Sequence, residues 1–478
     1  MTGSASVLTF AIVGHPNEGK SSVVSTLTED DSVRITPIPG ETTVCRTFPV
    51  VIDGLEIVRF VDTPGFQSPR AALAWLREHE GPDMLDSFLK EHCGDPLFSG
   101  ECELFRPLSQ GAGIIYVLDA SRPLRSMDRA EMEILRMTGI PRMAVINSKE
   151  EDRSFIPQWR DELRKHFNSV RIFNAHRATY AERVALLESL KSIDQEWEPA
   201  LVPVIRAVRE DWRRRMNQTA WHICGMIETC LAHQISQSYS QGEDLEEIRR
   251  KLIGEYQDHI RDVERKTHLE IRRLFKHNIF DYRLPEQSIA GKDLFHEKTW
   301  RLLGLNPYQI AAAGAAAGTG IGLGIDAATA GISFGVFAVS GAILGAGSAL
   351  VGGKRMVPTE IKGPKVGRFQ MKKSLGDFVL IVGPNHNIQF PFVLLDRALI
   401  YFSHVINWAH GRRNRQEETP DTGPETFVAR FTDRERKVCR EFFQAAGAKD
   451  EARIREDRQP MLDMLFEVLL CLSDREYR

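Results

Sequence analysis

A nine-residue stretch near the amino end, GHPNEGKSS, has the residue types and the spacing of a phosphate-binding loop. Gly14, Gly19, Lys20 and Ser21 fit the pattern G-x-x-x-x-G-K-S. In such a loop the glycines let backbone N–H groups converge on phosphate oxygens, and the lysine and the hydroxyl serve the terminal phosphates and Mg²⁺. A helix-like run follows, and the N-terminus of a helix is itself an anion site. The sequence therefore predicts a site for the phosphates of a nucleotide.

Two further segments carry residues suited to the same chemistry. The run FVDTPG ends an apolar strand in Asp62, whose carboxylate could hold Mg²⁺ directly or through water. Gly65, three residues later, can bring its backbone N–H close to a terminal phosphate. Residues 37–45, PIPGETTVC, are rich in proline and glycine and include Thr42 and Thr43. Such a loop is suited to order around a Mg²⁺-bound γ-phosphate.

The elements that must position these residues alternate along the chain. Six short runs within residues 7–175 have the composition of strands, and helix-like runs lie between them. This alternation predicts an α/β domain with a mostly parallel sheet, helices on both faces and ligands at the carboxyl ends of the strands.

Together, GHPNEGKSS, PGETT and DTPG resemble an Era-like GTPase of the translation-factor-related class, over about the first 195 residues. The resemblance implies a P-loop NTPase fold that binds GTP or GDP with Mg²⁺. It implies that Lys20 contacts the β- and γ-phosphates, that Ser21 and Thr42 ligate Mg²⁺, that Asp62 holds the metal's water and that Gly65 senses the γ-phosphate. The implied site also takes in Gly14, Asn17, Glu18, Gly19 and Ser22, with Thr43 as the alternative to Thr42.

The base-reading motifs depart from the family pattern. The family has N-K-x-D after the fifth strand, and its aspartate accepts hydrogen bonds from guanine. This chain has NSKE, in which Asn147 fits, Ser148 replaces the lysine and Glu150 replaces the aspartate. Glu150 could still accept both hydrogen bonds, although its extra methylene changes the geometry. Ala175 resembles the alanine that offers its N–H to the guanine O6 atom. Guanine is favoured, with adenine or relaxed specificity as the alternative.

The residues around the loop predict slow hydrolysis. Many small GTPases place a water-orienting glutamine after the aspartate motif, where this chain has Phe66. Pro16 narrows the loop where an arginine finger would enter. In several Era-like proteins an asparagine at the place of Asn17 helps to bind K⁺, which would put Asn17 beside Lys20, Thr42 and Gly65 among the catalytic residues. The alternative is that Asn17 only shapes the loop. Hydrolysis should therefore be slow unless a cation, a dimer through the switch regions or a partner protein completes the site.

Four regions are expected. Residues 1–198 form the GTPase domain. Its first switch is the loop at residues 37–45, its second switch is the segment at residues 60–65, and an insertion at about 67–113 lies beside the second switch. Residues 199–306 form a charged helical domain whose acids and bases nearly cancel, and whose one dense basic spot is WRRRMN. Residues 354–478 contain a basic segment, a small β-hairpin in DFVLIVGPNHNIQFPFVLL and C-terminal helices. Because the net charge is −3, nucleic acid is an unexpected partner.

Residues 307–353 form the most unusual segment. They are rich in glycine and alanine, carry one charge at Asp326 and repeat small residues every four positions. This spacing lets helices pack closely in membranes, and basic residues on both flanks favour a hairpin with both ends on the cytoplasmic side. Membrane lipid contact is the favoured interpretation. The alternative is a tightly packed helical hairpin inside a soluble protein.

The leading hypothesis is a GTP-hydrolysing switch whose nucleotide state controls this helical, membrane-contacting half. One alternative is a ribosome or RNA-assembly GTPase, and another is a pore-like membrane module assembled by the nucleotide domain. Seven scattered cysteines and the lack of a signal peptide favour a cytoplasmic protein. The apolar segment would place it at the inner face of the cytoplasmic membrane, as a peripheral or integral protein. The whole arrangement resembles bacterial Era-like proteins fused to a C-terminal domain of unknown function.

Overall fold

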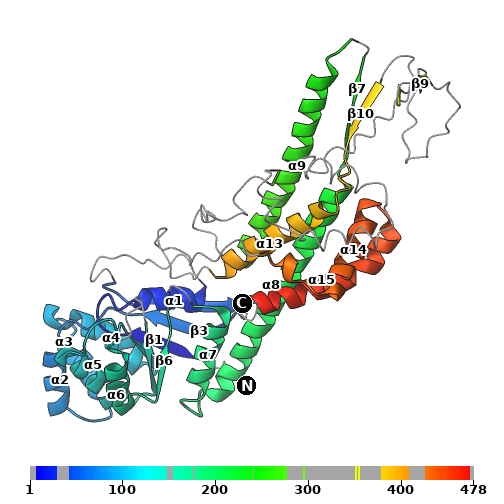
Figure 1. Ribbon diagram of the computed structural model, residues 1–478. Coiled ribbons are helices and arrows are strands. Elements are labelled where there is room, and N and C mark those ends of the chain that lie inside the picture. The colour runs from blue at the N-terminus through cyan, green and yellow to red at the C-terminus, as the bar shows by residue number, and fades with distance from the viewer. Residues whose placement is uncertain are drawn as a thin grey trace.

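The computed structural model describes residues 7–29, 42–147, 154–175, 178–240, 242–276, 294–295, 350–351, 354–355, 378–407 and 426–473. Figure 1 shows a layered α/β part at the amino end and long helices that extend away from it.

A six-stranded sheet lies at the centre of the α/β part, in the order β2-β3-β1-β4-β5-β6. Neighbouring strands run parallel, except that β2 pairs antiparallel with β3. The predicted mostly parallel sheet and its six strands are confirmed. They are β1 (Thr9–Val13), β2 (Arg46–Ile52), β3 (Leu55–Asp62), β4 (Gly113–Leu118), β5 (Arg142–Ile146) and β6 (Ser169–Ile172).

Helices cover both faces of this sheet, because successive side chains of a strand point to opposite sides. Ala11 and Val13 of β1 join an apolar cluster with α2 to α6, whereas Phe10 and Ile12 join a second cluster with α1, α7 and the start of α8. The covering elements are α1 (Lys20–Thr28), α2 (Pro69–Glu78), α3 (Met84–His92), η1 (Pro96–Phe98), α4 (Ser99–Ser109), α5 (Ser126–Met137), α6 (Ile156–His166) and α7 (Tyr180–Lys191). The segments α2, α3, η1 and α4 all lie between β3 and β4.

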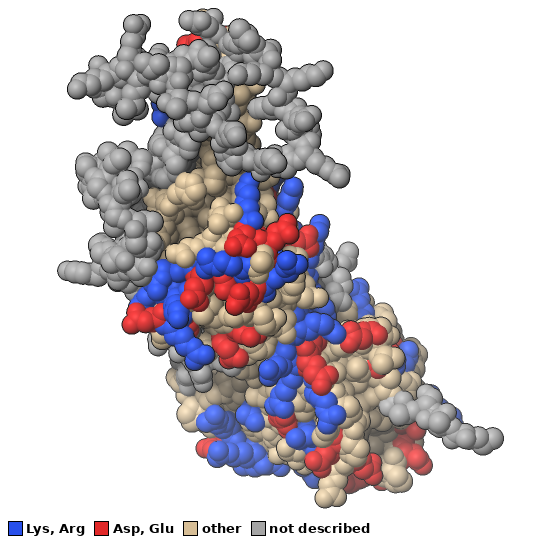
Figure 2. Space-filling model, turned by 90° about the vertical axis from the view of Figure 1, so that its right-hand side faces the viewer, with Lys and Arg blue, Asp and Glu red and all other residues tan. Residues whose placement is uncertain are grey.

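The C-terminal part is mainly helical, as predicted, and is built around one apolar cluster. Within it α13 is buried along almost its whole length, because its sequence is apolar on every side. Figure 2 shows lysine and arginine mixed with aspartate and glutamate over one face of the molecule. The elements are α8 (Glu198–Ala232), α9 (Leu245–Leu274), α13 (Gln389–Ile406), η3 (Val428–Arg430), α14 (Asp433–Gly447) and α15 (Glu451–Ser473), with two short strands β8 (Leu350–Val351) and β9 (Lys354–Arg355).

The small antiparallel sheet of this part is present, but its strands are not the two halves of the expected hairpin. Strand β10 (Phe378–Val382) pairs with β7 (Ile235–Tyr239), far earlier in the chain. The residues after the Gly-Pro-Asn turn begin α13 instead of a returning strand. A short apolar run fits a buried helix as well as a strand, and here burial against α8 and α9 decides for the helix.

The expected membrane segment, residues 307–353, lies outside the described residues apart from β8. Among the helices that the structure describes, none combines the length and the apolar character that crossing a bilayer requires.

Candidate nucleotide-binding site

The phosphate-binding loop connects β1 to α1 at the carboxyl edge of the sheet. Gly14 has a φ of 141°, and a Cβ there would lie 2.2 Å from the Val117 carbonyl oxygen, so the loop leaves β1 only with glycine at this place. Gly19, at a φ of 91°, caps the start of α1. The Lys20 ammonium donates to the carbonyl oxygens of Gly14, at 3.2 Å, and His15, at 2.9 Å. The loop is thus closed around the lysine that would meet the terminal phosphates.

Asp62, at the end of β3, lies beside the first turn of α1. Ser21 Oγ donates to Asp62 Oδ2 at 2.7 Å. The other oxygen, Oδ1, is buried and accepts no hydrogen bond from the described residues. Burial raises the pKa of Asp62, while the hydrogen bond from Ser21 and the charge of Lys20 oppose that shift. A buried carboxylate oxygen without a donor, next to a hydroxyl and an ammonium, fits a site for Mg²⁺ and phosphate.

Gly65 packs directly on the phosphate-binding loop. A Cβ at Gly65 would lie 2.4 Å from Pro16 Cδ, so this approach requires glycine and leaves little room above Pro16. Phe66 is buried and packs edge-on against Phe105 of α4, with ring centroids 6.4 Å apart. It belongs to the apolar core. Asn17, at a φ of 67°, is exposed at the loop's tip.

On the base side, Asn147 connects two of the predicted binding residues. Its Nδ2 donates to the Glu18 carbonyl oxygen at 3.0 Å, and its Oδ1 accepts from the Ala175 N–H at 3.1 Å. The Ala175 N–H is therefore engaged with Asn147 here, and its predicted donation to guanine stays a prediction. Glu150 lies outside the described residues, and Thr42, half-buried, is at the edge of them.

The structure adds two buried charge networks that the sequence analysis missed. Glu18 accepts from Arg122 at 2.6 Å and from the Asp119 N–H, and Arg122 also binds Asp128 at 2.8 Å. The spacing of residues in the sequence could not have identified these contacts. Arg122 precedes a different helix, α5, and Asp128 lies in the first turn of that helix.

The second network fixes the other side of the loop. His15 Nδ1 lies 2.8 Å from Glu131 Oε1, and Tyr116 Oη donates to Glu131 Oε2 at 3.0 Å. Glu131 is fully buried in α5. The hydrogen bond to Glu131 raises the pKa of His15.

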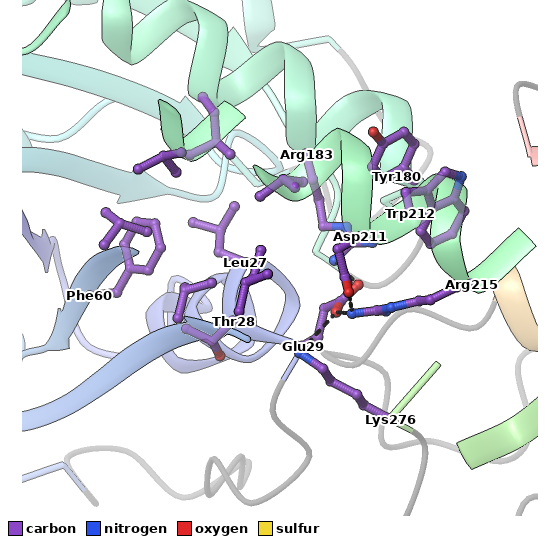
Figure 3. A pocket seen from close by; sticks show the side chains of 16 residues that line it. Leu27, Thr28, Glu29, Phe60, Tyr180, Arg183, Asp211, Trp212, Arg215 and Lys276 are labelled. Atoms are coloured by element: carbon purple, nitrogen blue, oxygen red, sulfur yellow. Dashed lines mark hydrogen bonds and ion pairs between the residues drawn. The ribbon is translucent and has the colours of Figure 1, made fainter. Parts of the chain in front are cut away.

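A cluster of ion pairs surrounds Glu29, the residue that ends α1 and precedes the segment carrying the predicted first switch. Glu29 contacts Arg183 of α7 at 2.5 Å, Arg215 of α8 at 2.8 Å and Lys276, beyond the end of α9, at 3.5 Å. Asp211 contacts Arg215 at 2.5 Å. In Figure 3 the three cationic side chains converge on Glu29 from separate elements, at the rim of a small pocket. Part of the basic spot WRRRMN is thus used inside the molecule.

Comparison with known proteins relates two successive parts of the chain to two families. A family described as 50S ribosome-binding GTPase matches residues 9–148, and one described as a domain of unknown function, DUF3482, matches residues 160–467. The tRNA modification GTPase MnmE of Pediococcus pentosaceus is 32% identical over 144 residues, which are 30% of this chain and 25% of that protein. MnmE of Oceanobacillus iheyensis is 26% identical over 247 residues, which are 49% of this chain and 51% of that protein. A structure of Era from Aquifex aeolicus bound to GDP and aluminium fluoride is 17% identical, with a TM-score of 0.28 over 56% of this chain and 89% of that one.

The chain thus spans a quarter to a half of the length of these curated relatives. Its amino-terminal part is a P-loop GTPase domain, which matches the GTPase family model over residues 9–148 and is similar to part of MnmE. Because the second family match covers most of the 478 residues, the chain belongs to the DUF3482 family and carries this GTPase domain at its amino-terminal end.

Proposed function

We propose that this protein binds and hydrolyses GTP and that its nucleotide state controls the helical C-terminal part. The observation that carries the first half of the proposal is the arrangement at Asp62. Its buried Oδ1 has no donor among the described residues, and it lies on the carboxylate that accepts from Ser21, one residue after Lys20. A bound cation and its water would satisfy that oxygen.

The chain's own residues then have distinct tasks. Lys20 binds the β- and γ-phosphates, with the backbone N–H groups of Asn17 to Ser22 around them. Ser21 and Thr42 hold Mg²⁺, and Asp62 orients the metal's water. Gly65 places its N–H toward the γ-phosphate, while Asn147, Ala175 and Glu150 read guanine. Mg²⁺, when bound, neutralises charge that develops on the transferred phosphoryl group.

Hydrolysis is proposed to depend on a group from outside the described residues. Phe66 is buried, and Pro16 in contact with Gly65 crowds the space that an arginine finger would need. Asn17, exposed at the tip of the loop, is the candidate K⁺ ligand. Replacing K⁺ with Na⁺ should lower the turnover rate, and an unchanged rate would refute this role for Asn17.

The Glu29 cluster supports the second half of the proposal. Glu29 precedes the segment that contains the predicted first switch. Its three cationic partners come from α7, from α8 and from the residues just after α9. Arg215 and Glu29 are both largely buried, so the attraction between their charges is screened less than in an exposed ion pair. A rearrangement of the switch that moves Glu29 would therefore shift α8 and the end of α9.

The nucleotide half of the proposal is tested by titrating GTP, GDP and ATP with Mg²⁺ into the full chain and into Lys20→Ala. We expect guanine nucleotides to bind more tightly than ATP, and Lys20→Ala to weaken GTP more than GDP, because the ammonium contacts the terminal phosphates. A preference for ATP would overturn the guanine assignment. A folded chain that binds no nucleotide would overturn the proposal.

The control half is tested by hydrogen exchange of α8 and α9 with a GTP analogue and with GDP. We expect the two nucleotides to give different protection around Arg215 in the wild type, and Glu29→Gln to shrink that difference while GTP still binds. The matched control is Glu188→Gln, which removes a more exposed pair with Arg209 of α8, at 3.1 Å. An equal nucleotide response in the wild type and Glu29→Gln would contradict this route.

For the output of the switch we propose lipid contact through residues 307–353 at the inner face of the cytoplasmic membrane. The small-residue spacing and the basic flanks of that segment support it. Liposome flotation with GTP analogue, GDP and no nucleotide tests it. Equal absence from the lipid fraction in all three samples would end this part of the proposal.

A further inference from the structure

Helix α4 contacts both segments that flank the phosphate site. Cys45 is the last residue of the predicted first switch, and its N–H donates to Glu103 Oε2 at 3.2 Å. The Cys45 thiol donates to the Glu103 carbonyl oxygen at 3.0 Å. Two residues earlier on the same helix, Glu101 binds the segment that follows Gly65. One helix, in a segment that no nucleotide contact has been assigned to, therefore touches both ends of the site.

The contact on the Gly65 side is made by a buried carboxylate. Glu101 Oε1 accepts from the Gln67 N–H at 2.7 Å and from the Ser68 N–H at 2.5 Å. The fit is close, since a Cβ at Gly100 would lie 2.8 Å from Gln67 Cγ. Phe105, one turn later, packs against Phe66. Residues 66, 67 and 68 are thus all held by α4 before α2 begins at Pro69.

Burying the Glu101 carboxylate at this place costs folding stability. Glu101 is 0% exposed, and its Oε2 has no hydrogen-bond partner in the described part of the chain. Burial raises the pKa of the Glu101 carboxyl, and the three backbone N–H groups that it meets, including its own at the start of α4, lower it. A buried carboxylate with one unsatisfied oxygen costs stability, so its presence here calls for a functional explanation.

We propose that Glu101 is a positioning residue that fixes the backbone after Gly65 so that the Gly65 N–H faces the γ-phosphate. Glu103 holds Cys45 from the same helix, so α4 makes the two switch segments move together. This inference rests on the proposed function. The inference goes beyond the proposed function because it assigns the distinction between GTP and GDP to α4, a helix that has no assigned nucleotide contact.

The test compares Glu101→Ala and Glu101→Gln with the full-length wild type. The Kd of a GTP analogue and of GDP is measured for each. Only the triphosphate meets Gly65, so we expect Glu101→Ala to weaken the analogue about tenfold and GDP little, from the loss of a charge-assisted hydrogen bond. Glu101→Gln keeps an acceptor oxygen and should give a smaller loss. Hydrogen exchange of the Gln67 and Ser68 amides should quicken in the same order.

The matched control is Glu91→Gln on α3, an exposed carboxylate that accepts from Trp75 Nε1 at 3.1 Å in the same segment. It should leave both affinities unchanged. If the Glu101 variants weaken binding of the analogue and of GDP equally, Glu101 has only a structural role and the inference is overturned. If they weaken binding of neither nucleotide, the inference is also overturned. If Glu101→Ala does not fold, the ratio measured for Glu101→Gln decides. If the wild type binds no nucleotide, the proposed function fails first, which separates the two outcomes.

Discussion

Asp62 combines two properties that seldom occur together, a carboxylate charge and almost complete burial. It is 3% exposed, and burial raises its pKa while Ser21 and Lys20 counter that effect. The arrangement is favourable only if a cation compensates the charge, since removing a carboxylate from water is costly. Under the proposed function, the cost of burying Asp62 in the apo protein is offset by affinity for a metal-bound phosphate.

Asp62→Asn should therefore separate metal-dependent from metal-independent binding. Because the amide keeps one oxygen but loses the charge, we expect the affinity for GTP with Mg²⁺ to fall about 10–100-fold, the usual effect of losing a partner of the metal's ligands. In EDTA the affinity should change little. Isothermal titration under both conditions measures the difference, and equal affinities of the two proteins with Mg²⁺ would contradict the role of Asp62.

At the residue scale, the sequence could locate the loop residues because phosphate-binding loops are local patterns. Gly14, Gly19, Lys20 and Ser21 lie within eight positions, and the structure keeps them together at the end of β1. Glu131 and Glu101 could not be located in this way. Each is an ordinary glutamate on an amphipathic helix, and only the tertiary fold brings it to His15 or to Gln67.

At the scale of elements, the joint between β4 and α8 depends on a glycine. Gly113 begins β4, and Trp197 immediately precedes α8. A Cβ at Gly113 would lie 2.5 Å from the Trp197 ring and 2.9 Å from Phe10. Trp197 meets the ring of Phe10 edge-on, with centroids 5.0 Å apart. The start of α8 is thus seated directly on the central sheet.

Two glycine-to-alanine changes should consequently act in opposite directions. Gly113→Ala should lower the free energy of unfolding by about 1–3 kcal/mol, because the added methyl overpacks this joint. Gly225→Ala, inside α8 with nothing within 4 Å of the added Cβ, should raise it by about 0.5–1 kcal/mol, because alanine favours helix over glycine. Urea unfolding followed by circular dichroism measures both. A stabilising Gly113→Ala would show that the contact with Trp197 is loose.

The pairing of strand β10 is a feature of the fold that the sequence could not predict. The strand β10 was predictable from its β-branched residues, but its partner was not. Val379 lies opposite Ser238 in β7, and the intervening chain contains all of α9. A turn such as Gly-Pro-Asn predicts a reversal of the chain, whereas the element after it is chosen by burial. Residues from Gln389 onward are apolar enough on all sides to fill the centre of a helical cluster.

At the scale of the whole molecule, α8 belongs to two cores. Its first turns place Leu201 and Ile205 in the cluster under the nucleotide sheet, and residues from Trp212 to Leu231 belong to the cluster of the helical part. A continuous helix transmits displacement along its axis more faithfully than a flexible linker does. Together with the ion pairs of Glu29, α8 joins the core of the helical part to that of the GTPase domain, as the proposed control of the helical part by nucleotide requires.

The helical part has its own titratable core, which predicts how the molecule responds to acid. His268 of α9 stacks on Tyr401 of α13, with centroids 3.9 Å apart and planes within 5°. Glu264 and Arg397 form a buried pair nearby, with Nε and Oε1 2.5 Å apart, and Arg272 faces Tyr401. Burial lowers the pKa of His268 to about 4, an effect that Arg397 strengthens and Glu264 opposes.

Because the pKa of His268 is about 6.5 when unfolded and about 4 when folded, the unfolded state binds more protons between these values. The contribution of neutral His268 is complete above pH 6.5 and is lost as the pH falls toward 4, by about 3 kcal/mol in all. His268→Phe keeps the ring on Tyr401 and cannot titrate. Urea unfolding at pH 7 and pH 4 should therefore show the variant gaining about that much relative to the wild type, whatever its stability at pH 7. Parallel losses in both proteins would place the acid sensitivity outside His268.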